Sequence, residues 1–292
     1  MNGKLYVVAT PIGNLDELSP RALEALKTAD IIAAEDTRVT KALLHRFGIK
    51  KRMVSYFRHN EEVRAEALIN NMLDGLTVAL VSDAGTPGIS DPGHVLVRRA
   101  DESGIGITAV GGPCAVAAAL SISGFDSSSF VFYGFLPRKK GDLAAALKRI
   151  RADSASVAVI YESPIRIVRT MEAIGQSMPE AGLCLCNDLT KKFERVYRGS
   201  PAEVLARLME NSDREKGEYT LVMEKPPTSP AEGQKESGVC IEALLVDIMI
   251  KEQRTLKDAI SALASREDAP GRNEIYEASL GLKEFLGEHG HE

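Results

Sequence analysis

Strand-like and helix-like segments alternate through the first half of the chain. The strand-like runs span 4–9, 31–34, 77–82 and 105–110. Ser19-Pro20 places an N-cap and a first-turn proline before a helix to about residue 29, and Thr37 is expected to cap a second helix to 47. Further helices are predicted at 60–74 and from Asp91-Pro92 onward. Such alternation indicates a parallel sheet covered by helices.

The pattern restarts near residue 122. Strands are predicted at 130–133, 157–161, 183–186 and 219–224, and helices at 142–151, 164–174 and 201–210. The following stretch is rich in proline, glycine and polar residues, which indicates a linker. Three helices should follow it, one to about 252, one from Thr255 and one over 272–286, and Thr255-x-x-Asp258 resembles a capping box. The predicted domains are therefore 1–121, 122–226 and 239–292, with the linker at 227–238.

Charge and cysteine spacing restrict the possible functions. The net charge of −5 provides no global attraction to phosphate backbones. The C-terminal segment 239–292 holds six lysines and arginines against eleven aspartates and glutamates, which argues against charge-driven nucleic-acid binding there. The four cysteines lack C-x-x-C spacing, so neither a disulfide framework nor a zinc site is indicated. Because no apolar run is long enough for a signal peptide or a membrane span, we expect a cytoplasmic protein.

Three loops with the composition of ligand-binding loops follow predicted strands. The segment 81–93 carries three glycines, two prolines and two carboxylates, and the segments 9–16 and 110–115 are of similar character. Glycine lets the main chain approach a ligand and proline fixes its path. Loops that leave parallel strands at one sheet edge converge, which predicts a small-molecule site. Neither G-x-G-x-x-G nor a P-loop occurs at the first strand, so another nucleotide-like cofactor is needed.

Six segments, in order over some 190 residues, resemble the 16S ribosomal RNA cytidine 2′-O-methyltransferase family of the tetrapyrrole-methylase superfamily. They are 5–15 (LYVVATPIGNL), 33–38 (AAEDTR), 82–93 (SDAGTPGISDPG), 134–139 (GFLPRK), 161–164 (YESP) and 189–192 (LTKK). The resemblance implies an α/β fold of two domains with S-adenosylmethionine in the cleft between them, plus a small C-terminal helical module. It also implies a homodimer that methylates the decoding region of 16S ribosomal RNA in the 30S subunit.

Three positions depart from the family pattern. Cys114 stands where serine is common, Ile165 stands where histidine often follows Glu-Ser-Pro, and Phe57-Arg58 interrupts a usually histidine-rich stretch. A proton-transfer role for either missing histidine is therefore in doubt.

Cofactor contacts are expected from the three loops. Hydroxyls and main-chain groups there would hold the methionine carboxylate and amine. The candidates are Pro11, Gly13, Asp83, Gly85, Thr86, Ser90, Gly112, Pro113, Cys114 and Ala115. The alternative is that these loops are tight turns that only join strands to helices. Asp91 fits a helix N-cap and a ligand contact equally well.

Catalytic candidates follow strands in both predicted domains. They are Glu35, Asp36, Arg38, Glu162 and Lys191. A carboxylate–arginine pair is also a common structural clamp. A lysine with a depressed pKa could accept the proton of a ribose 2′-hydroxyl, whereas a charged lysine would grip phosphate, and we favour the phosphate role for Lys191 and Lys192.

RNA contact is expected from Arg138, Lys139 and Lys140 together with Lys192. The run 138–151 holds six basic residues and one acidic residue, although its later part is equally consistent with a solvated helix face. The run Lys50-Lys51-Arg52 is assigned to solubility. Two alternatives stay open: a porphyrinoid C-methyltransferase of the precorrin type, and a non-catalytic ribosome-binding protein that keeps the fold as a scaffold.

Overall fold

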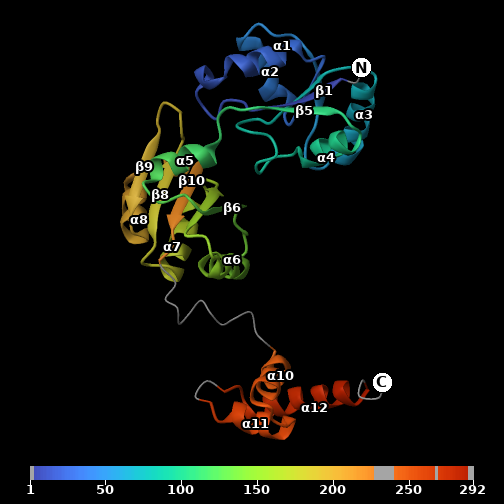
Figure 1. Cartoon of the computed structure of the whole chain (residues 1–292). Coiled ribbons are helices and arrows are strands. Elements are labelled where there is room, and N and C mark those ends of the chain that lie inside the picture. Colours follow the sequence, from blue (N-terminus) through green and yellow to red (C-terminus); the bar gives the residue numbers. More distant parts are fainter. Residues whose placement is uncertain (1–2, 227–239, 267–268, 289–292) are drawn as a thin grey trace. The chain divides into compact units, whose positions relative to one another are not determined.

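The computed structural model describes residues 3–226, 240–266 and 269–288, and the chain divides into two compact units, Met1–Pro227 and Thr228–Glu292. The larger unit contains two five-stranded sheets (Figure 1). The predicted linker, 227–238, lies outside the described residues. None of the described helices combines the length and apolar character that crossing a membrane requires.

The first sheet has the strand order β3-β2-β4-β1-β5, and all its paired strands are parallel, as the sequence predicted. Its strands are β1 (Lys4–Val8), β2 (Ile31–Ala34), β3 (Arg52–Ser55), β4 (Val78–Val81) and β5 (Gly106–Val110). The intervening helices are η1 (Leu15–Glu17), α1 (Pro20–Thr28), α2 (Thr37–Arg46), α3 (Glu61–Leu73) and α4 (His94–Glu102). The central strands β2 and β4 are buried along their whole length, as expected for a sheet covered on both faces.

The helices cover the two faces of this sheet in pairs (Figure 1). Leu80 of β4 packs with Leu68 of α3 and Leu96 of α4, whereas the next residue, Val81, packs with Leu26 of α1 and Leu44 of α2. This switch follows from the two-residue side-chain period of a strand. The result is a three-layer arrangement in which every loop that follows a strand emerges at the same edge.

Two predicted helix starts need correction. Asp36, and not Thr37, caps α2, because its carboxylate accepts the N–H of Arg38. Helix α4 begins at His94 with Gly93 at its N-cap, at a φ of 151°, so Asp91-Pro92 do not start it. The buried carboxylate of Glu61 accepts the Gly93 N–H at 2.9 Å. A side chain from another helix therefore satisfies a donor near the start of α4.

The second sheet has the order β6-β7-β10-β8-β9, with β6 and β7 parallel and the other pairs antiparallel. Its strands are β6 (Phe130–Phe135), β7 (Val157–Glu162), β8 (Gly182–Asn187), β9 (Arg195–Gly199) and β10 (Tyr219–Glu224). Its helices are α5 (Ala115–Ser123), α6 (Lys140–Ala152), α7 (Ile167–Ser177) and α8 (Pro201–Glu210). The α7 helix starts later than predicted, because Ser163 and Pro164 form a turn closed by a hydrogen bond from Arg166 N–H to Ser163 O.

Helix α5 belongs by packing to the second sheet. Its residues Val116 and Ala119 share a core with Val159 and Val222 of that sheet. Ile12, from the loop after β1, joins the same core. The predicted division after residue 121 falls inside this helix, which connects the two sheets directly.

The smaller unit consists of α10 (Ile241–Glu252), α11 (Leu256–Ala264) and α12 (Arg272–Glu288). They enclose a core of their own that includes Leu245, Leu263 and Ile275. The Thr255 hydroxyl caps α11 by accepting the Asp258 N–H, as the sequence indicated.

Candidate functional site

A cavity of about 360 Å³ lies between the strand-end loops of the first sheet and the ends of β6, β7 and β10. The residues from the first half that line it include Ile12, Glu35, Asp83, Gly85, Thr86, Ser90, Asp91, Cys114 and Ala115. The second half contributes Phe135, Tyr161, Glu162, Ser163, Pro164, Glu218, Tyr219 and Thr220. This volume falls within the range of roughly 300–1,000 Å³ that is usual for small-molecule sites.

The three glycine-rich loops converge at this cavity, as expected from their places on neighbouring strands. The main chains of Thr10 and Gly85 exchange two hydrogen bonds, at 2.8 and 3.0 Å. The hydroxyl of Thr86 donates to the Pro113 carbonyl at 3.1 Å, which joins the second loop to the third. Gly85 has a φ of +84°, a backbone conformation that glycine adopts without strain.

The carboxylates of Glu35 and Asp83 link the ends of two adjacent strands by hydrogen bonds. Glu35 follows β2 and accepts the N–H of Asp83 at 3.4 Å, while Asp83 follows β4 and accepts the N–H of Asp36 at 2.9 Å. Burial raises the pKa of Glu35 and of Asp83 above their ordinary values, although these backbone hydrogen bonds oppose the shifts. The cavity wall therefore holds partly desolvated carboxylates.

Asp36 and Arg38 form a clamp outside the cavity lining. The Arg38 guanidinium donates to the Asp36 carboxylate at 2.6 Å, and these hydrogen bonds lower the Asp36 pKa to about 2. The Arg38 side chain is 89% exposed, and neither residue lines the cavity. The clamp alternative raised by the sequence fits this geometry.

Glu162 lines the cavity, but its carboxylate is already fully engaged. One oxygen accepts the Ser163 N–H at 2.7 Å, and the other accepts the Thr170 hydroxyl at 2.7 Å and lies 3.2 Å from the Arg166 guanidinium. Only 2% of the residue is exposed. Glu162 therefore anchors the start of α7, and its catalytic assignment remains a prediction.

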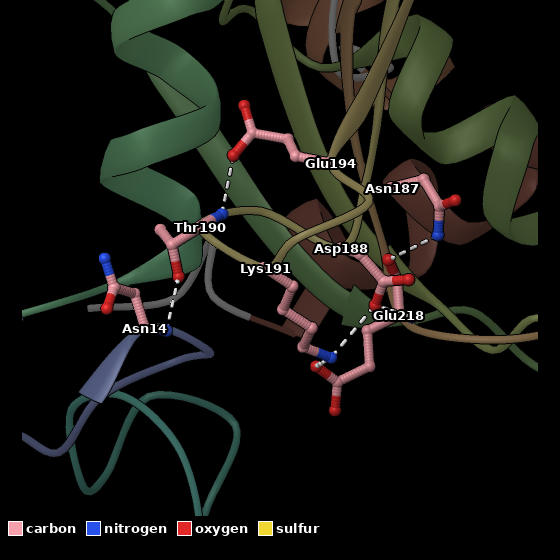
Figure 2. Close-up of polar contacts among 7 residues, drawn as sticks. All are labelled: Asn14, Asn187, Asp188, Thr190, Lys191, Glu194 and Glu218. Carbon is pink, nitrogen blue, oxygen red and sulfur yellow. Dashed lines mark hydrogen bonds and ion pairs between the residues drawn. The ribbon is translucent and has the colours of Figure 1, made fainter. Parts of the chain in front are cut away.

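Lys191 is held by two carboxylates, as Figure 2 shows. Its Nζ lies 2.9 Å from Asp188 and 2.9 Å from Glu218. Burial lowers the pKa of Lys191, but the hydrogen bonds to Glu218 and Asp188 outweigh it and raise that pKa above its ordinary value. Lys191 is therefore a charged group at neutral pH and is unsuited to accept a proton.

Lys191 belongs to a loop that contacts the first half of the chain (Figure 2). The Thr190 hydroxyl accepts the N–H of Asn14 at 3.1 Å, and a Cβ at Gly13 would lie 2.4 Å from Lys191 Cγ. Asp188 and Thr190 have φ values of +54° and +65°. Ser90, in the cavity wall, also has a left-handed backbone, with a φ of +74°.

The structure divides the predicted cofactor residues into two groups. Those in direct contact with the cavity are Asp83, Gly85, Thr86, Ser90, Cys114 and Ala115. Pro11, Gly13, Gly112 and Pro113 do not line it. These four lie in the loops that form the wall; for example, a Cβ at Gly112 would come within 3.0 Å of the Ala9 Cβ. Their predicted cofactor contact stays a prediction.

Sequence reasoning missed the aromatic wall of the cavity. Tyr161 packs edge-on against Phe132 and Phe135, with ring centroids 4.7 and 5.8 Å apart. Phe135 is 57% exposed. Burial raises the pKa of Tyr161, so its hydroxyl is neutral. Tyr161 lies in the motif YESP and Phe135 in the motif GFLPRK, so the family resemblance could have pointed to both residues.

The predicted RNA-contacting residues are on the surface. Arg138, Lys139, Lys140 and Lys192 are all exposed. The loop that carries the first three is held by Arg166, whose guanidinium donates to the Leu136 and Pro137 carbonyls at 2.7 and 3.2 Å. Lys192 Nζ lies 5.5 Å from the centroid of the Phe193 ring, which is a cation–π contact.

The departures from the family pattern have different positions. Cys114 lines the cavity, whereas Ile165 is 84% exposed and does not. The Arg58 guanidinium donates to the Ser90 carbonyl at 3.3 Å, and its positive charge partly opposes the rise that burial causes in the pKa of Glu35. Arg58 therefore acts electrostatically on the cavity wall from the loop after β3.

The cavity is acidic. Within the part of the chain that the structure describes, five carboxylate side chains line it and no lysine or arginine does. Two of the five, Glu162 and Glu218, are paired with Arg166 and Lys191, which leaves Glu35, Asp83 and Asp91 as the unpaired carboxylates of the described lining. The described residues contain no cluster of three or more metal-ligating side chains. Such a lining favours a cationic ligand and disfavours phosphate groups inside the cavity.

Comparison with known proteins gives the family. The family model described as Tetrapyrrole (Corrin/Porphyrin) Methylases matches residues 4–205. The protein named Ribosomal RNA small subunit methyltransferase I from Neisseria meningitidis serogroup B is 39% identical over 284 residues, 97% of this chain and 95% of its own length. The chain belongs to the ribosomal RNA small subunit methyltransferase I family. A second relative of that name, from Escherichia coli O157:H7, is 39% identical over 95% of both chains.

Solved structures support the fold of this family. Diphthine synthase superimposes with a TM-score of 0.58 over 76% of this chain and 90% of its own, at 17% sequence identity. At that identity the likeness concerns the fold alone. It confirms the two-domain α/β architecture of the tetrapyrrole methylases that the motifs had indicated.

Proposed function

We propose that this chain transfers a methyl group from S-adenosylmethionine to the ribose 2′-oxygen of a cytidine in the decoding region of 16S ribosomal RNA, within the 30S subunit. The observation that carries the proposal is the acidic cavity formed by the three converging loops in a member of this family. The relatives' names supply the ribosomal RNA substrate, and the motif resemblance supplies the nucleotide and the oxygen.

The cavity fits the proposed methyl donor. S-adenosylmethionine carries a positive sulfonium and a positive amine, and the wall includes Glu35 and Asp83, with no lysine or arginine among the described lining residues. The hydroxyls of Thr86 and Ser90 and the main chain at Gly85 provide further polar contacts. When bound, this group would supply the electrophilic methyl carbon.

The chain's own residues then have to orient the substrate and remove a proton. The aromatic wall of Phe135 and Tyr161 offers a face on which a base or the adenine ring can stack. Holding the reacting atoms in line can contribute about 7–11 kcal/mol to lowering the barrier. A weak acid such as a 2′-hydroxyl also needs a proton acceptor close by, which typically adds about 10²–10⁴-fold.

The RNA backbone is proposed to bind outside the cavity. Arg138 lies three residues beyond Phe135 of the cavity wall, so the exposed Arg138-Lys139-Lys140 run can take the phosphates that an acidic cavity would repel. Lys192, which is exposed in the loop after β8, would extend this contact, whereas the phosphate role predicted for Lys191 would require it to leave Asp188 and Glu218. The segment 239–292 is proposed to dock the ribosomal particle by shape, because its charge gives no attraction to RNA.

The porphyrinoid alternative is less compatible with the cavity. Precorrin-type substrates carry several carboxylates, and an acidic lining would repel them. The scaffold alternative would not require three loops in close contact around a cavity. Both alternatives are distinguishable from the proposal by a single labelling experiment.

The test uses labelled S-adenosylmethionine and purified 30S particles that lack the modification. We expect label on one ribose, mapped by the resistance of the 2′-O-methylated linkage to alkali. Particles that already carry the modification are the matched control and should accept no label. Transfer to a precorrin and not to the particle would contradict the RNA assignment, and absence of cofactor binding would favour the scaffold.

Sedimentation of the full chain tests the proposed homodimer, and cell fractionation tests the proposed cytoplasmic location.

A further inference from the structure

Asp91 lies in the loop between β4 and α4 and faces the cavity. Because Gly93 is the N-cap of α4, the carboxylate of Asp91 is not used as a cap. It lines the cavity together with Glu35 and Asp83. Of the two roles that the sequence left open, the structure thus excludes the N-cap, and the ligand contact stays a prediction.

The other cavity carboxylates are engaged with groups of the protein. Glu162 binds Thr170, Arg166 and the Ser163 N–H, and Glu218 pairs with Lys191. Glu35 and Asp83 each accept a backbone N–H from a neighbouring strand end. Asp91 is hydrogen-bonded by the Ser82 side chain and, among the described residues, forms no ion pair. It retains acceptor capacity that faces the cavity.

The backbone on both sides of Asp91 is fixed. On one side the Arg58 guanidinium donates to the Ser90 carbonyl, and Ser90 itself is held at a φ of +74°. On the other side the Gly93 N–H donates to the carboxylate of Glu61, which is 6% exposed. A reactive group must be held in this way, because small displacements from the productive geometry slow a reaction strongly.

Charged and polar groups face Asp91 from several elements. Glu35 lies at the end of β2, Asp83 at the end of β4, Arg58 in the loop after β3 and Tyr161 in β7. Burial, followed by the negative charge of Glu35, raises the pKa of Asp91 to about 6. Ser82 and Arg58 oppose this shift. A carboxylate tuned in this way is a stronger base than an exposed one and is still mainly ionised at neutral pH.

We propose that Asp91 is a catalytic residue that accepts the proton of the ribose 2′-hydroxyl. This inference rests on the proposed function. The O–H bond breaks and its proton moves to the carboxylate, while the oxygen forms a bond to the methyl carbon. The carbon–sulfur bond breaks and its electron pair stays on sulfur, which becomes a neutral thioether. The protonated Asp91 then returns its proton to water.

The test compares the full-length wild-type chain with Asp91→Asn. We expect kcat on unmodified 30S particles to fall by about 10²–10⁴-fold, while KM for both substrates stays within about threefold. The wild-type kcat/KM should decline below about pH 6, and this limb should be lost from the residual activity of the variant. Asp101→Asn, on the exposed part of α4, is the matched control and should behave as wild type.

A measurement without the cofactor tests the same assignment. Carbon-13 NMR of aspartate carboxyls in the free protein should show one group that titrates near pH 6 and is missing in Asp91→Asn. If the variant folds poorly, Asp91→Glu keeps the carboxylate and should retain part of the activity together with the acidic limb. Unchanged kcat in Asp91→Asn, or a raised KM for S-adenosylmethionine alone, would overturn the proposal.

Failure of the proposed function gives a different result. If the wild-type chain binds the cofactor but transfers no methyl to a competent 30S particle, the RNA assignment fails and the catalytic role of Asp91 fails with it. If the wild type is active and Asp91→Asn is equally active, only the role of Asp91 is wrong.

Discussion

The backbone N–H of Asn14 donates to the side-chain hydroxyl of Thr190 at 3.1 Å (Figure 2). This hydrogen bond joins the loop after β1 to the loop after β8, and therefore the two halves of the larger unit. Thr190 has a left-handed backbone conformation, with a φ of +65°. Because β-branched residues rarely adopt this conformation, the contact comes at a conformational cost.

The first prediction concerns this contact. Thr190→Ala removes the acceptor, and we expect the Kd for S-adenosylmethionine to rise by about 2- to 10-fold, equivalent to about 0.5–1.5 kcal/mol for one hydrogen bond. The reason is that the loops on either side of the cavity lose a direct link. Isothermal titration calorimetry measures the effect, and Thr190→Ser, which keeps the hydroxyl, should bind as wild type. Equal affinity in Thr190→Ala and wild type would show that the link does not affect binding.

The second prediction separates structure from catalysis at Glu162. Glu162→Gln leaves the Arg166 guanidinium without its charge partner, and that side chain is only 21% exposed. Breaking a buried pair typically costs about 3–5 kcal/mol, so we expect a clear loss in the free energy of unfolding, measured in urea. Glu172→Gln, on the exposed surface of α7, is the control. Full stability with lost activity would instead support direct catalysis by Glu162.

The third prediction follows from the raised pKa of Asp91. In the folded chain this group ionises near pH 6, whereas its ordinary value is 3.8, so its ionisation destabilises the folded state as pH rises through that interval. Asp91→Asn should therefore melt at a higher temperature than wild type at pH 7.5, and the difference should shrink toward pH 4.5. Thermal unfolding followed by circular dichroism measures it. A variant less stable than wild type at pH 7.5 would contradict the burial argument, and Asp101→Asn should show no pH-dependent difference.

The fourth prediction concerns RNA affinity. Replacing Arg138, Lys139 and Lys140 by alanine should raise KM for the 30S particle about tenfold or more. The slope of the logarithm of RNA affinity against the logarithm of salt concentration should become shallower by about one unit for each lost phosphate contact. The Kd for S-adenosylmethionine should not change, because none of the three lines the cavity. The triple alanine variant of Lys50, Lys51 and Arg52 removes the same charge and should leave KM and the salt slope unchanged. Similar effects from both variants would indicate non-specific attraction only.

Local sequence patterns predicted most of the elements. Strands β2 and β10 and helix α8 have the predicted bounds. The reason is that the apolar pattern of each strand, and the apolar pattern and capping residue of the helix, lie within a few neighbouring residues. Strand β3 was missed because it lies at the edge of its sheet, carries Arg52 and is nowhere fully buried. Helix α5 was missed because it is apolar almost throughout and carries no capping side chain.

The sequence by itself determined the fold class, the three glycine-rich loops and the family, because strand alternation, glycine spacing and ordered motifs are properties of the chain read in one dimension. Only the tertiary structure decided which polar groups remain free to act. Glu162 and Lys191 are engaged by Arg166, Asp188 and Glu218, while Asp91 faces the cavity. Hydrogen-bond partners and desolvation depend on residues far apart in the chain, so no local pattern specifies them.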